Sequence, residues 1–300
     1  MPNESADGRS YIGKRAIVIG AGVSGLAAAR AVADHFEEVV VLERDELPSG
    51  ATTRPGVPQG TQAHGLLGGA LKGLRELFPG FDQDLAEAGA VPINVGFEAL
   101  QELPGFDPFP MRKWNWSIYS LTRPLIELIM RQRIEQQQNI SLRGGSQVFE
   151  IVGTPDGDRV TGVRCQTAEG PEEIQADLVI DASKHGSLTL LFLKSTGQPV
   201  PAETAIGVDI RYATARFELR PGALGEFKAC VTFPKPPEEV NAGYLLPVEN
   251  SCYQLLLIGR GGNMPPTEGA AFLEYARKLS TPSIYNAMKG SMQLGEVARY

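Results

Sequence analysis

Three segments rich in apolar residues follow one another within the first fifty residues, separated by short stretches that are less apolar. Residues 15–19 form a short apolar run rich in β-branched side chains, which predicts a buried parallel strand. Residues 26–33 are rich in alanine and predict a helix, and residues 38–43 predict a second strand that ends in an acid. This order of strand, helix and strand predicts a βαβ unit.

The pattern changes twice further along the chain. Two helices are expected in the middle of the first half, at residues 66–78 and 125–138. Next come a predicted β-meander and an apolar strand of parallel type, with strands at residues 147–152, 160–166, 172–176 and 178–181. After residue 200, alternating strands and one helix predict an antiparallel sheet domain, with strands at residues 206–212, 229–233 and 253–258 and a helix at residues 267–279.

These elements predict an α/β fold that is α+β overall. A Rossmann-like nucleotide-binding domain with a β-meander is expected from residues 14–90 and 121–199. The antiparallel-sheet domain, which would bind substrate, is expected from residues 91–120 and 200–300. Residues 1–13 are polar, lack an apolar signal core and are expected to form a flexible tail.

Composition excludes several classes of partner. The chain has 300 residues and a formal net charge of −7, which argues against nucleic acid or an anionic membrane as a partner. No run of about 18 apolar residues occurs, so no transmembrane helix is expected. Cys165, Cys230 and Cys252 lie far apart and are expected to be buried free thiols of a cytoplasmic protein. The three histidines show no metal-ligand spacing, so no metal site is expected.

The turn between the first strand and the first helix is Gly20-Ala-Gly-Val-Ser-Gly25. Gly20 permits a tight turn, Gly22 lets a pyrophosphate approach the backbone, and Gly25 lets the helix pack against the sheet. The amides of the first helical turn, at Val23 and Ser24, would face the phosphates.

The acid that ends the second strand completes this pattern. Glu43 follows Gly25 by 18 residues, and it can accept hydrogen bonds from adenosine ribose hydroxyls and repel a 2′-phosphate. The pattern predicts an adenine dinucleotide site. The alternative is a chance glycine-rich turn in an ordinary βαβ unit.

The sequence also resembles FAD-dependent enzymes of the aromatic-hydroxylase fold. It is most similar to flavin monooxygenases of secondary metabolism, including polyether-type epoxidases. The similarity covers roughly residues 14–300 and is carried by the segments 20–25, 42–45, 56–60, 63–64, 76–80, 122–127, 159–164, 176–183, 244–247 and 259–262.

The resemblance implies further cofactor contacts. Arg44 would lie near the adenosine or pyrophosphate, and Arg123 near the pyrophosphate or ribityl chain, because that phosphate needs a compensating cation. Asp181 would help to position the middle of FAD. The loop 55–65 would line the isoalloxazine, with His64 near it. Solvated or structurally paired arginines, and a buried structural histidine, are the alternatives.

The sequence departs from the family pattern in two ways. Lys184 stands where the family has a glycine, so Lys184 and His185 would either contact phosphate or form an exposed turn. The sequence ends at Tyr300, before the Gly-Asp-Ala segment of the family. On this ground we expect either a fragment or a divergent protein that binds FAD weakly.

The resemblance implies a monooxygenase whose chemistry comes from the cofactor. NAD(P)H, as a transient reductant, or a separate flavin reductase would reduce FAD. A flavin C4a-hydroperoxide formed with O2 would then hydroxylate or epoxidise a small organic substrate. Residues 97–119 and the outward face of the 206–258 sheet would shape the pocket, but no catalytic side chain is singled out. The alternatives are a flavin-dependent reductase or dehydrogenase of the same fold, and a truncated non-catalytic flavin-binding protein.

Overall fold

The βαβ unit predicted at the start of the chain is present. Strand β3 (Gly13–Ile19) leads into helix α1 (Val23–Ala33), which returns to strand β4 (Phe36–Leu42), and β3 and β4 pair in parallel. Apolar, β-branched side chains fill both strands because both faces of a parallel sheet are covered. In this computed structural model, residues 3–4, 10–115 and 117–300 are described.

The chain divides into two compact units. Unit one comprises residues 1–57 and 126–205, and unit two comprises residues 58–125 and 206–300. The second boundary falls within helix α4 (Arg123–Glu135). Unit one therefore differs in extent from the predicted segments 14–90 and 121–199, since residues 58–90 and 121–125 belong to unit two.

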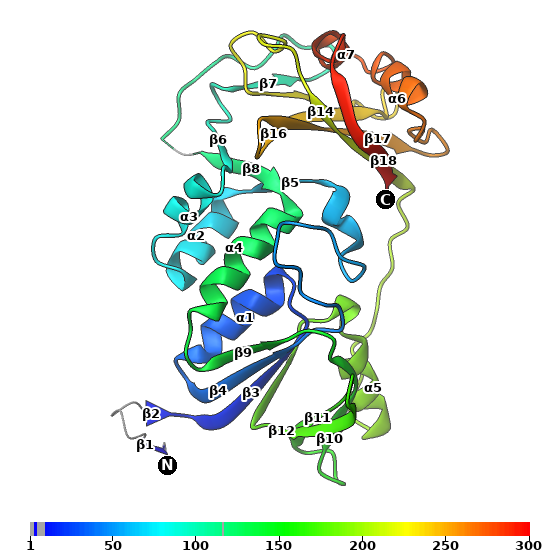
Figure 1. The fold of residues 1–300 in the computed structure, drawn as a ribbon. Coiled ribbons are helices and arrows are strands. Elements are labelled where there is room, and N and C mark those ends of the chain that lie inside the picture. The colour runs from blue at the N-terminus through cyan, green and yellow to red at the C-terminus, as the bar shows by residue number, and fades with distance from the viewer. Residues whose placement is uncertain (1–2, 5–9, 116) are drawn as a thin grey trace. The chain divides into compact units, whose positions relative to one another are not determined.

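Unit one is built around a parallel sheet of order β13-β3-β4-β9. Its outer strands are β13 (Leu178–Asp181) and β9 (Ile140–Arg143). Figure 1 shows α1 and α4 on one side of this sheet and an antiparallel meander with helix α5 on the other. The meander strands and this helix are β10 (Gln147–Gly153), β11 (Val160–Thr167), β12 (Gly170–Gln175) and α5 (Ser187–Ser195).

The meander packs directly on the sheet. Ile17, Ile19, Val40 and Leu42 from the parallel strands share one apolar cluster with four side chains of the meander, Ile151, Val163, Cys165 and Ile174. These side chains alternate along each strand, as the period of two requires. The predicted Rossmann-like sheet with a β-meander is therefore confirmed.

Unit two contains a six-stranded sheet of order β18-β14-β17-β16-β15-β7. All neighbours are antiparallel except β15 and β7, which are parallel. The strands are β7 (Ala99–Glu102), β14 (Ile210–Glu218), β15 (Ala229–Thr232), β16 (Ala242–Val248), β17 (Cys252–Arg260) and β18 (Met292–Arg299). The predicted antiparallel-sheet domain is present.

Helices α6 (Gly269–Ala276) and α7 (Ser283–Met288) cover one face of this sheet. Phe217 and Phe272 stack in that core with ring centroids 6.2 Å apart. A second, three-stranded sheet of order β5-β8-β6 and further short helices complete unit two. These elements are η1 (Pro58–Thr61), β5 (Ala63–Leu66), α2 (Gly68–Leu77), α3 (Phe81–Glu87), β6 (Val91–Ile93) and β8 (Ile118–Thr122).

Several sequence-based expectations differ from the structure. The strand predicted at 206–212 begins only at Ile210, and Ile206 is 84% exposed. In the segment 97–119, which is expected to shape the substrate pocket, the side chains of Phe106, Phe109 and Trp114 are exposed, and Trp116 lies outside the described residues.

The expected tail, residues 1–13, is partly folded. Residues 1, 2 and 5–9 lie outside the described residues, whereas β1 (Asn3–Glu4) pairs with β2 (Ser10–Tyr11) and Tyr11 is buried. The three cysteines are free, with Cys165 and Cys230 buried and Cys252 half-buried.

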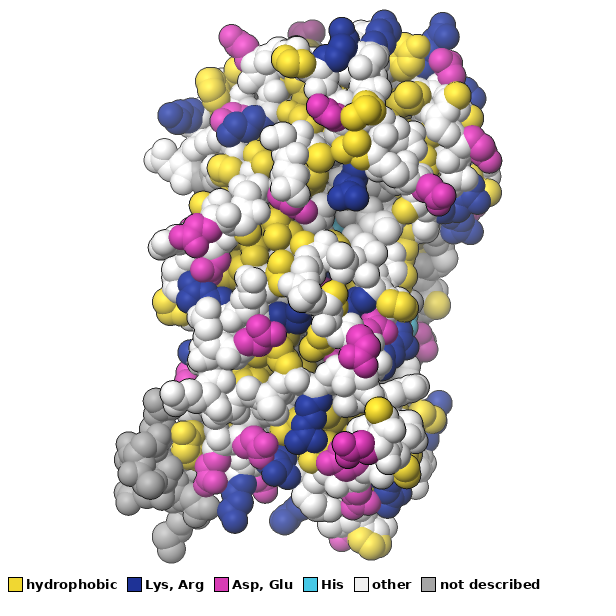
Figure 2. All heavy atoms as spheres, in the orientation of Figure 1, with side chains coloured by type: hydrophobic (Ala, Val, Ile, Leu, Met, Phe, Trp, Pro, Cys, Tyr) yellow, Lys and Arg dark blue, Asp and Glu magenta, His cyan; other side chains and the backbone are white. Residues whose placement is uncertain are grey.

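The surface carries charges of both signs. Figure 2 shows acidic and basic side chains intermixed over the face in view. Among the residues that the structure describes, no helix is both long and apolar enough to span a bilayer.

Candidate functional site

The turn between β3 and α1 is closed by two glycines that no other residue could replace without strain. Gly20 has a φ of +100°, a left-handed conformation that disfavours a side chain. A Cβ at Gly25 would lie 1.8 Å from the carbonyl oxygen of Gly20, so only glycine lets the helix come this close to the strand. Both roles match those predicted from the sequence.

Helix α1 presents an open amino end. Gly22 is its N-cap residue, with extended backbone (φ −75°, ψ 177°), and no side chain caps it. The first turn contains no acidic residue. The amides of Val23, Ser24 and Gly25 lie in the first turn, where the helix has no carbonyl four residues earlier to accept their hydrogen bonds. They are therefore suited to bind an anionic group.

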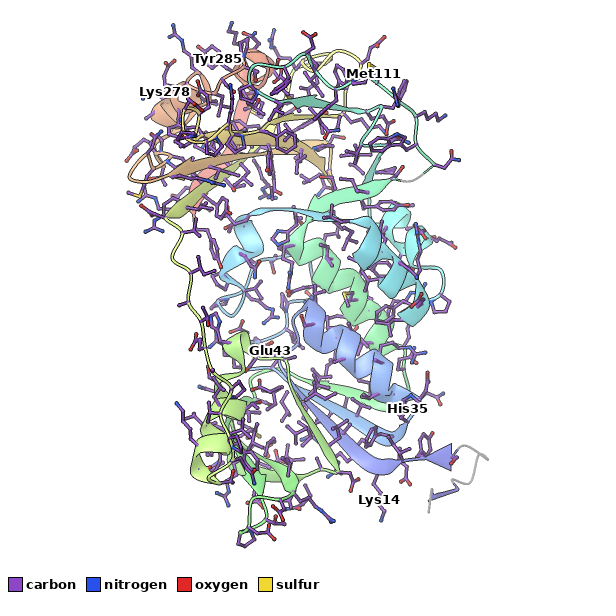
Figure 3. All side chains as sticks on the ribbon, turned by 180° about the vertical axis from the view of Figure 1, so that it is seen from behind. Lys14, His35, Glu43, Met111, Lys278 and Tyr285 are labelled. Atoms are coloured by element: carbon purple, nitrogen blue, oxygen red, sulfur yellow. The ribbon has the colours of Figure 1, made fainter. Side chains whose placement is uncertain are left out.

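Glu43 follows the last residue of β4 and is buried beside this turn. Figure 3 shows it at the carboxyl end of the parallel strands, opposite the end marked by Lys14 and His35. Its Oε2 accepts a hydrogen bond from the Ala21 amide at 2.8 Å, and its Oε1 accepts one from the Asp45 amide at 3.1 Å. The carboxylate is therefore fixed against the glycine turn.

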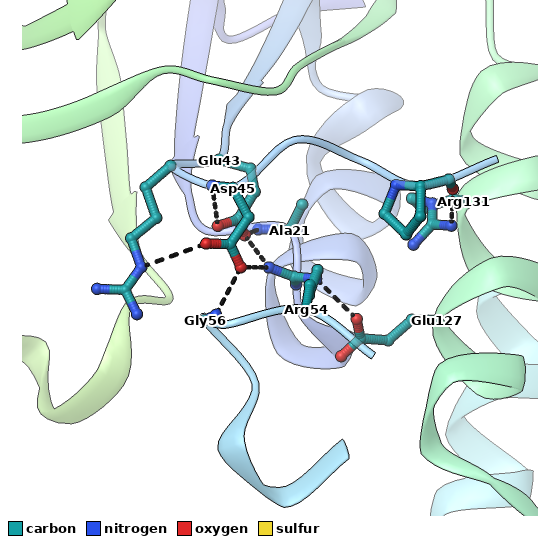
Figure 4. Close-up of polar contacts among 9 residues, drawn as sticks. Ala21, Glu43, Asp45, Arg54, Gly56, Glu127 and Arg131 are labelled. Atoms are coloured by element: carbon teal, nitrogen blue, oxygen red, sulfur yellow. Dashed lines mark hydrogen bonds and ion pairs between the residues drawn. The ribbon is translucent and has the colours of Figure 1, made fainter. Parts of the chain in front are cut away.

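Arg54 is a residue of this site that sequence reasoning missed. Its guanidinium is only 5% exposed, and its Nη1 lies 2.9 Å from Glu43 Oε2 and 3.1 Å from Asp45 Oδ2. Its Nε donates to Glu127 Oε2 of α4 at 3.2 Å. Figure 4 shows this cluster, in which the Gly56 amide also donates to Asp45.

The charges in this cluster set the ionisation of its arginines. Burial alone would lower the pKa of Arg54, but Glu43, Glu127 and Asp45 together hold it above its usual value. Burial lowers the pKa of Arg131, which donates to the Pro48 carbonyl at 2.6 Å.

The Glu43 carboxylate can accept one more hydrogen bond. A carboxylate can accept about four hydrogen bonds, and three donors contact Glu43.

Asp181 ends β13, next to β3 in the sheet. Its Oδ1 accepts hydrogen bonds from the amide and hydroxyl of Ser183, and its Oδ2 accepts them from the amide and hydroxyl of Thr189. Burial raises the pKa of Asp181, but these hydrogen bonds outweigh it and keep the pKa below its usual value. This carboxylate ties the end of the strand to helix α5.

The departure from the family pattern at Lys184 is accommodated locally. Residues 184–186 form a 3-10 turn, η2 (Lys184–Gly186), ahead of α5. The left-handed backbone in this turn is taken up by His185, with a φ of +65°, and by Gly186, with a φ of +58°.

The other three predicted contacts come from three different segments of the chain. Arg44 is 58% exposed and its Nε lies 3.9 Å from Asp45. His64 and Arg123 belong to unit two, on β5 and at the start of α4. The Nδ1 of His64 is 2.8 Å from the Gln62 carbonyl oxygen, which favours a proton on that nitrogen.

Acidic, histidine and cysteine side chains are the usual protein ligands of metal ions. No group of three or more of them is arranged to hold a metal ion within the described ranges.

Solved structures of flavoproteins share this fold. The chain matches the flavin-dependent brominase Bmp2 with a TM-score of 0.68 at 12% identity, covering 96% of this chain and 67% of Bmp2. It matches PqsL, a probable FAD-dependent monooxygenase from Pseudomonas aeruginosa, with a TM-score of 0.65 at 12% identity, covering 94% and 73% of the two chains. It matches p-nitrophenol 4-monooxygenase PnpA from Pseudomonas putida DLL-E4 with a TM-score of 0.66 at 14% identity, covering 96% and 68%.

Sequence comparison gives a curated relative and a family. The chain is 30% identical over 295 residues to protein Rv3254 of Mycobacterium tuberculosis, covering 93% of this chain and 60% of that protein. It thus spans about three fifths of the relative's length. Residues 16–192, more than half of the chain, match the model of the FAD dependent oxidoreductase family. The glycine turn, Glu43 and Asp181 all lie within the matched residues, and the chain belongs to the FAD dependent oxidoreductase family.

Proposed function

We propose that this chain binds FAD and takes part in a monooxygenase reaction on a small organic molecule. The observation that carries the proposal is the β3–α1 turn, where the glycine backbone, the open amino end of α1 and the buried Glu43 meet. Family membership supports the cofactor, and the fold shared with FAD-dependent monooxygenases supports the reaction class.

The residues of unit one fit the ADP half of FAD. The Gly22 backbone and the first-turn amides of α1 would receive the pyrophosphate. The remaining acceptor capacity of Glu43 suits an adenosine ribose hydroxyl, and its negative charge disfavours a 2′-phosphate. Arg54 would hold the Glu43 carboxylate in place.

The predicted contacts of Arg44, His64, Arg123 and Asp181 complete this proposal. Arg44 is exposed, with its Nε 3.9 Å from Asp45, and its guanidinium would pair with a phosphate. Asp181 would act by fixing the turn before α5, because four donors already occupy its carboxylate. His64 and Arg123 are proposed to contact the flavin half and the pyrophosphate, respectively.

Bound FAD would supply the redox and oxygen chemistry, with NAD(P)H or a separate reductase as the source of electrons. The chain would then bind the cofactor, orient the substrate and exclude water. We propose hydroxylation or epoxidation as the reaction, with a secondary metabolite as the substrate.

Isotope labelling tests the reaction class. The chain, supplied with FAD and NADPH, is incubated under 18O2 with a panel of aromatic and alkene substrates. The proposal expects one 18O atom in each product molecule and no product under nitrogen. Equal product formation under nitrogen would contradict a monooxygenase and favour a reductase or dehydrogenase of the same fold.

A further inference from the structure

The six-stranded sheet of unit two has two different faces. Side chains alternate along its strands, and one set packs under α6 and α7. The other set, here called the open sheet face, is carried by the three central strands β14, β16 and β17. It comprises Ile210, Tyr212, Thr214, Arg216, Ala242, Tyr244, Leu246, Gln254, Leu256, Ile258 and Arg260. Residues 61–63 pack on part of this face, where Thr214 Oγ1 donates to Gln62 Oε1 at 2.6 Å.

The open sheet face is mainly apolar and aromatic. Ala242, Leu256 and Ile258 are buried on it, and Tyr212 and Tyr244 pack against them. The ring of Tyr244 meets that of Phe233 edge-on, with centroids 6.3 Å apart. Such a surface suits the planar or apolar body of a small organic molecule.

Two cations lie on this face, the exposed Arg216 toward one end and the half-buried Arg260 at the other. Arg260 ends β17, and its Nε is buried without a hydrogen-bond partner among the described residues. The guanidinium also forms no ion pair with any residue that the structure describes. A buried guanidinium donor is unfavourable without an acceptor, so this position favours binding of an anionic group that accepts its hydrogen bond.

Tyr244, on the neighbouring strand β16, adds a neutral donor. Burial raises the pKa of Tyr244, the neighbouring Tyr212 raises it further, and Arg260 opposes this shift without reversing it. The Tyr244 phenol therefore keeps its proton at neutral pH and can donate to an oxygen anion. A planar guanidinium with a neighbouring phenol matches the geometry of a carboxylate.

We propose that the open sheet face binds the substrate and that the substrate is an apolar organic acid whose carboxylate pairs with Arg260. This inference rests on the proposed function and names the substrate class of that same enzyme. Leu256, Ile258 and the tyrosine rings would contact the apolar body. Arg260 is a specificity-determining residue, because a neutral analogue would leave its guanidinium without an acceptor.

Binding of matched acid and neutral probes tests the inference. The affinities of 1-naphthoate and 1-naphthamide for the full chain are measured by titration calorimetry. We expect naphthoate to bind at least about tenfold more tightly than naphthamide, and Arg260→Gln to abolish this preference. Arg260→Lys should restore part of it, because the charge is kept and the planar fork is lost.

Two further variants serve as controls. Arg211→Gln removes an exposed arginine on β14 that pairs with Asp209 and whose side chain alternates to the other face, so it should leave the preference unchanged. Tyr244→Phe removes one hydroxyl and should weaken naphthoate binding a few-fold. Thermal unfolding of each variant confirms that it is folded.

The outcomes separate this inference from the proposed function. Equal binding of the two probes, no binding of naphthoate, or a preference kept in folded Arg260→Gln would overturn the organic-acid assignment. FAD binding, measured by flavin fluorescence on the same samples, reports on the cofactor proposal alone. Flavin binding without an acid preference would reject only the substrate class, whereas an acid preference without flavin binding would reject only the cofactor proposal.

Discussion

At the scale of single residues, the candidate site depends on contacts that cannot be deduced from sequence spacing. Gly20, Gly25 and Glu43 could be predicted because each has a local reason within one βαβ unit. Arg54 could not, because its partner Glu127 lies 73 residues away and no periodic pattern marks the loop between β4 and η1. An arginine in a Gly/Pro-rich loop gives no signal of burial.

Removing the charge of Arg54 should destabilise unit one strongly. Arg54→Met keeps much of the apolar stem but leaves Glu43, Asp45 and Glu127 without their shared cation. Breaking such a buried pair typically costs about 3–5 kcal/mol. Urea unfolding should show this loss, while Arg44→Met, at an exposed position, should stay within about 0.5 kcal/mol of the unmodified chain. Equal stability of the two variants would show that the cluster is not a stabilising element.

Replacing Gly25 by alanine should destabilise the chain, whereas the same change at Gly73 in helix α2 should stabilise it. The new Cβ in α1 would lie 1.8 Å from the Gly20 oxygen, so strand and helix must separate at a cost of about 1–3 kcal/mol. Gly73 lies within α2 with no atom within 4 Å of a Cβ, so Gly73→Ala should gain up to about 1 kcal/mol from helix propensity. Thermal unfolding of both variants measures these changes in stability. Equal stability of Gly25→Ala and the unmodified chain would refute the close packing.

At the scale of elements, the prediction succeeded where one segment has a strong period of its own. The strands β3, β4 and β10–β13 and helices α1, α2, α4 and α6 lie near their expected positions. The strands β5–β8 were not predicted, because they are short and are completed by pairing with distant segments. The parallel pairing of β7 with β15 joins residues about 130 positions apart, which no local pattern indicates.

The turn between β13 and α5 should give a pH-dependent contribution to stability. The pKa of Asp181 in the folded chain is lower than its usual value, so its ionised form stabilises the fold above the unfolded pKa. This contribution is lost as the pH falls through the folded pKa. Asp181→Asn should therefore be less stable than the unmodified chain at pH 7, by about 1–2 kcal/mol, and the difference should shrink toward pH 3.

A matched acid provides the control for this pH series. Asp34 is 66% exposed and pairs with Arg30 across one turn of α1, so Asp34→Asn should change stability by less than about 0.5 kcal/mol at either pH. Chemical unfolding at pH 7, 5 and 3 measures all three proteins. A constant difference between Asp181→Asn and the unmodified chain across that range would contradict the role assigned to the carboxylate.

At the scale of the whole molecule, the chain combines a unit built on a parallel sheet and a unit built mainly on an antiparallel sheet, each with its own core. The change in architecture could be predicted because the hydrophobic pattern changes after residue 200. The position along the chain where the units meet could not be predicted, since the boundary falls inside the continuous helix α4. Family membership now rests on the matched residues 16–192, which include the whole glycine turn.

The central claim is that the turn of residues 20–25 binds the ADP half of FAD, and a competition titration tests it most directly. FAD bound to the purified chain is displaced by ADP or by riboflavin, and flavin fluorescence is followed. We predict saturable FAD binding, for which ADP competes more strongly than riboflavin. Gly22→Val should abolish binding in a chain that still folds, because the Gly22 backbone is extended and tolerates valine while its side chain would block the pyrophosphate. Unchanged FAD affinity in folded Gly22→Val, or no competition by ADP, would show that residues 20–25 do not bind the ADP half of FAD.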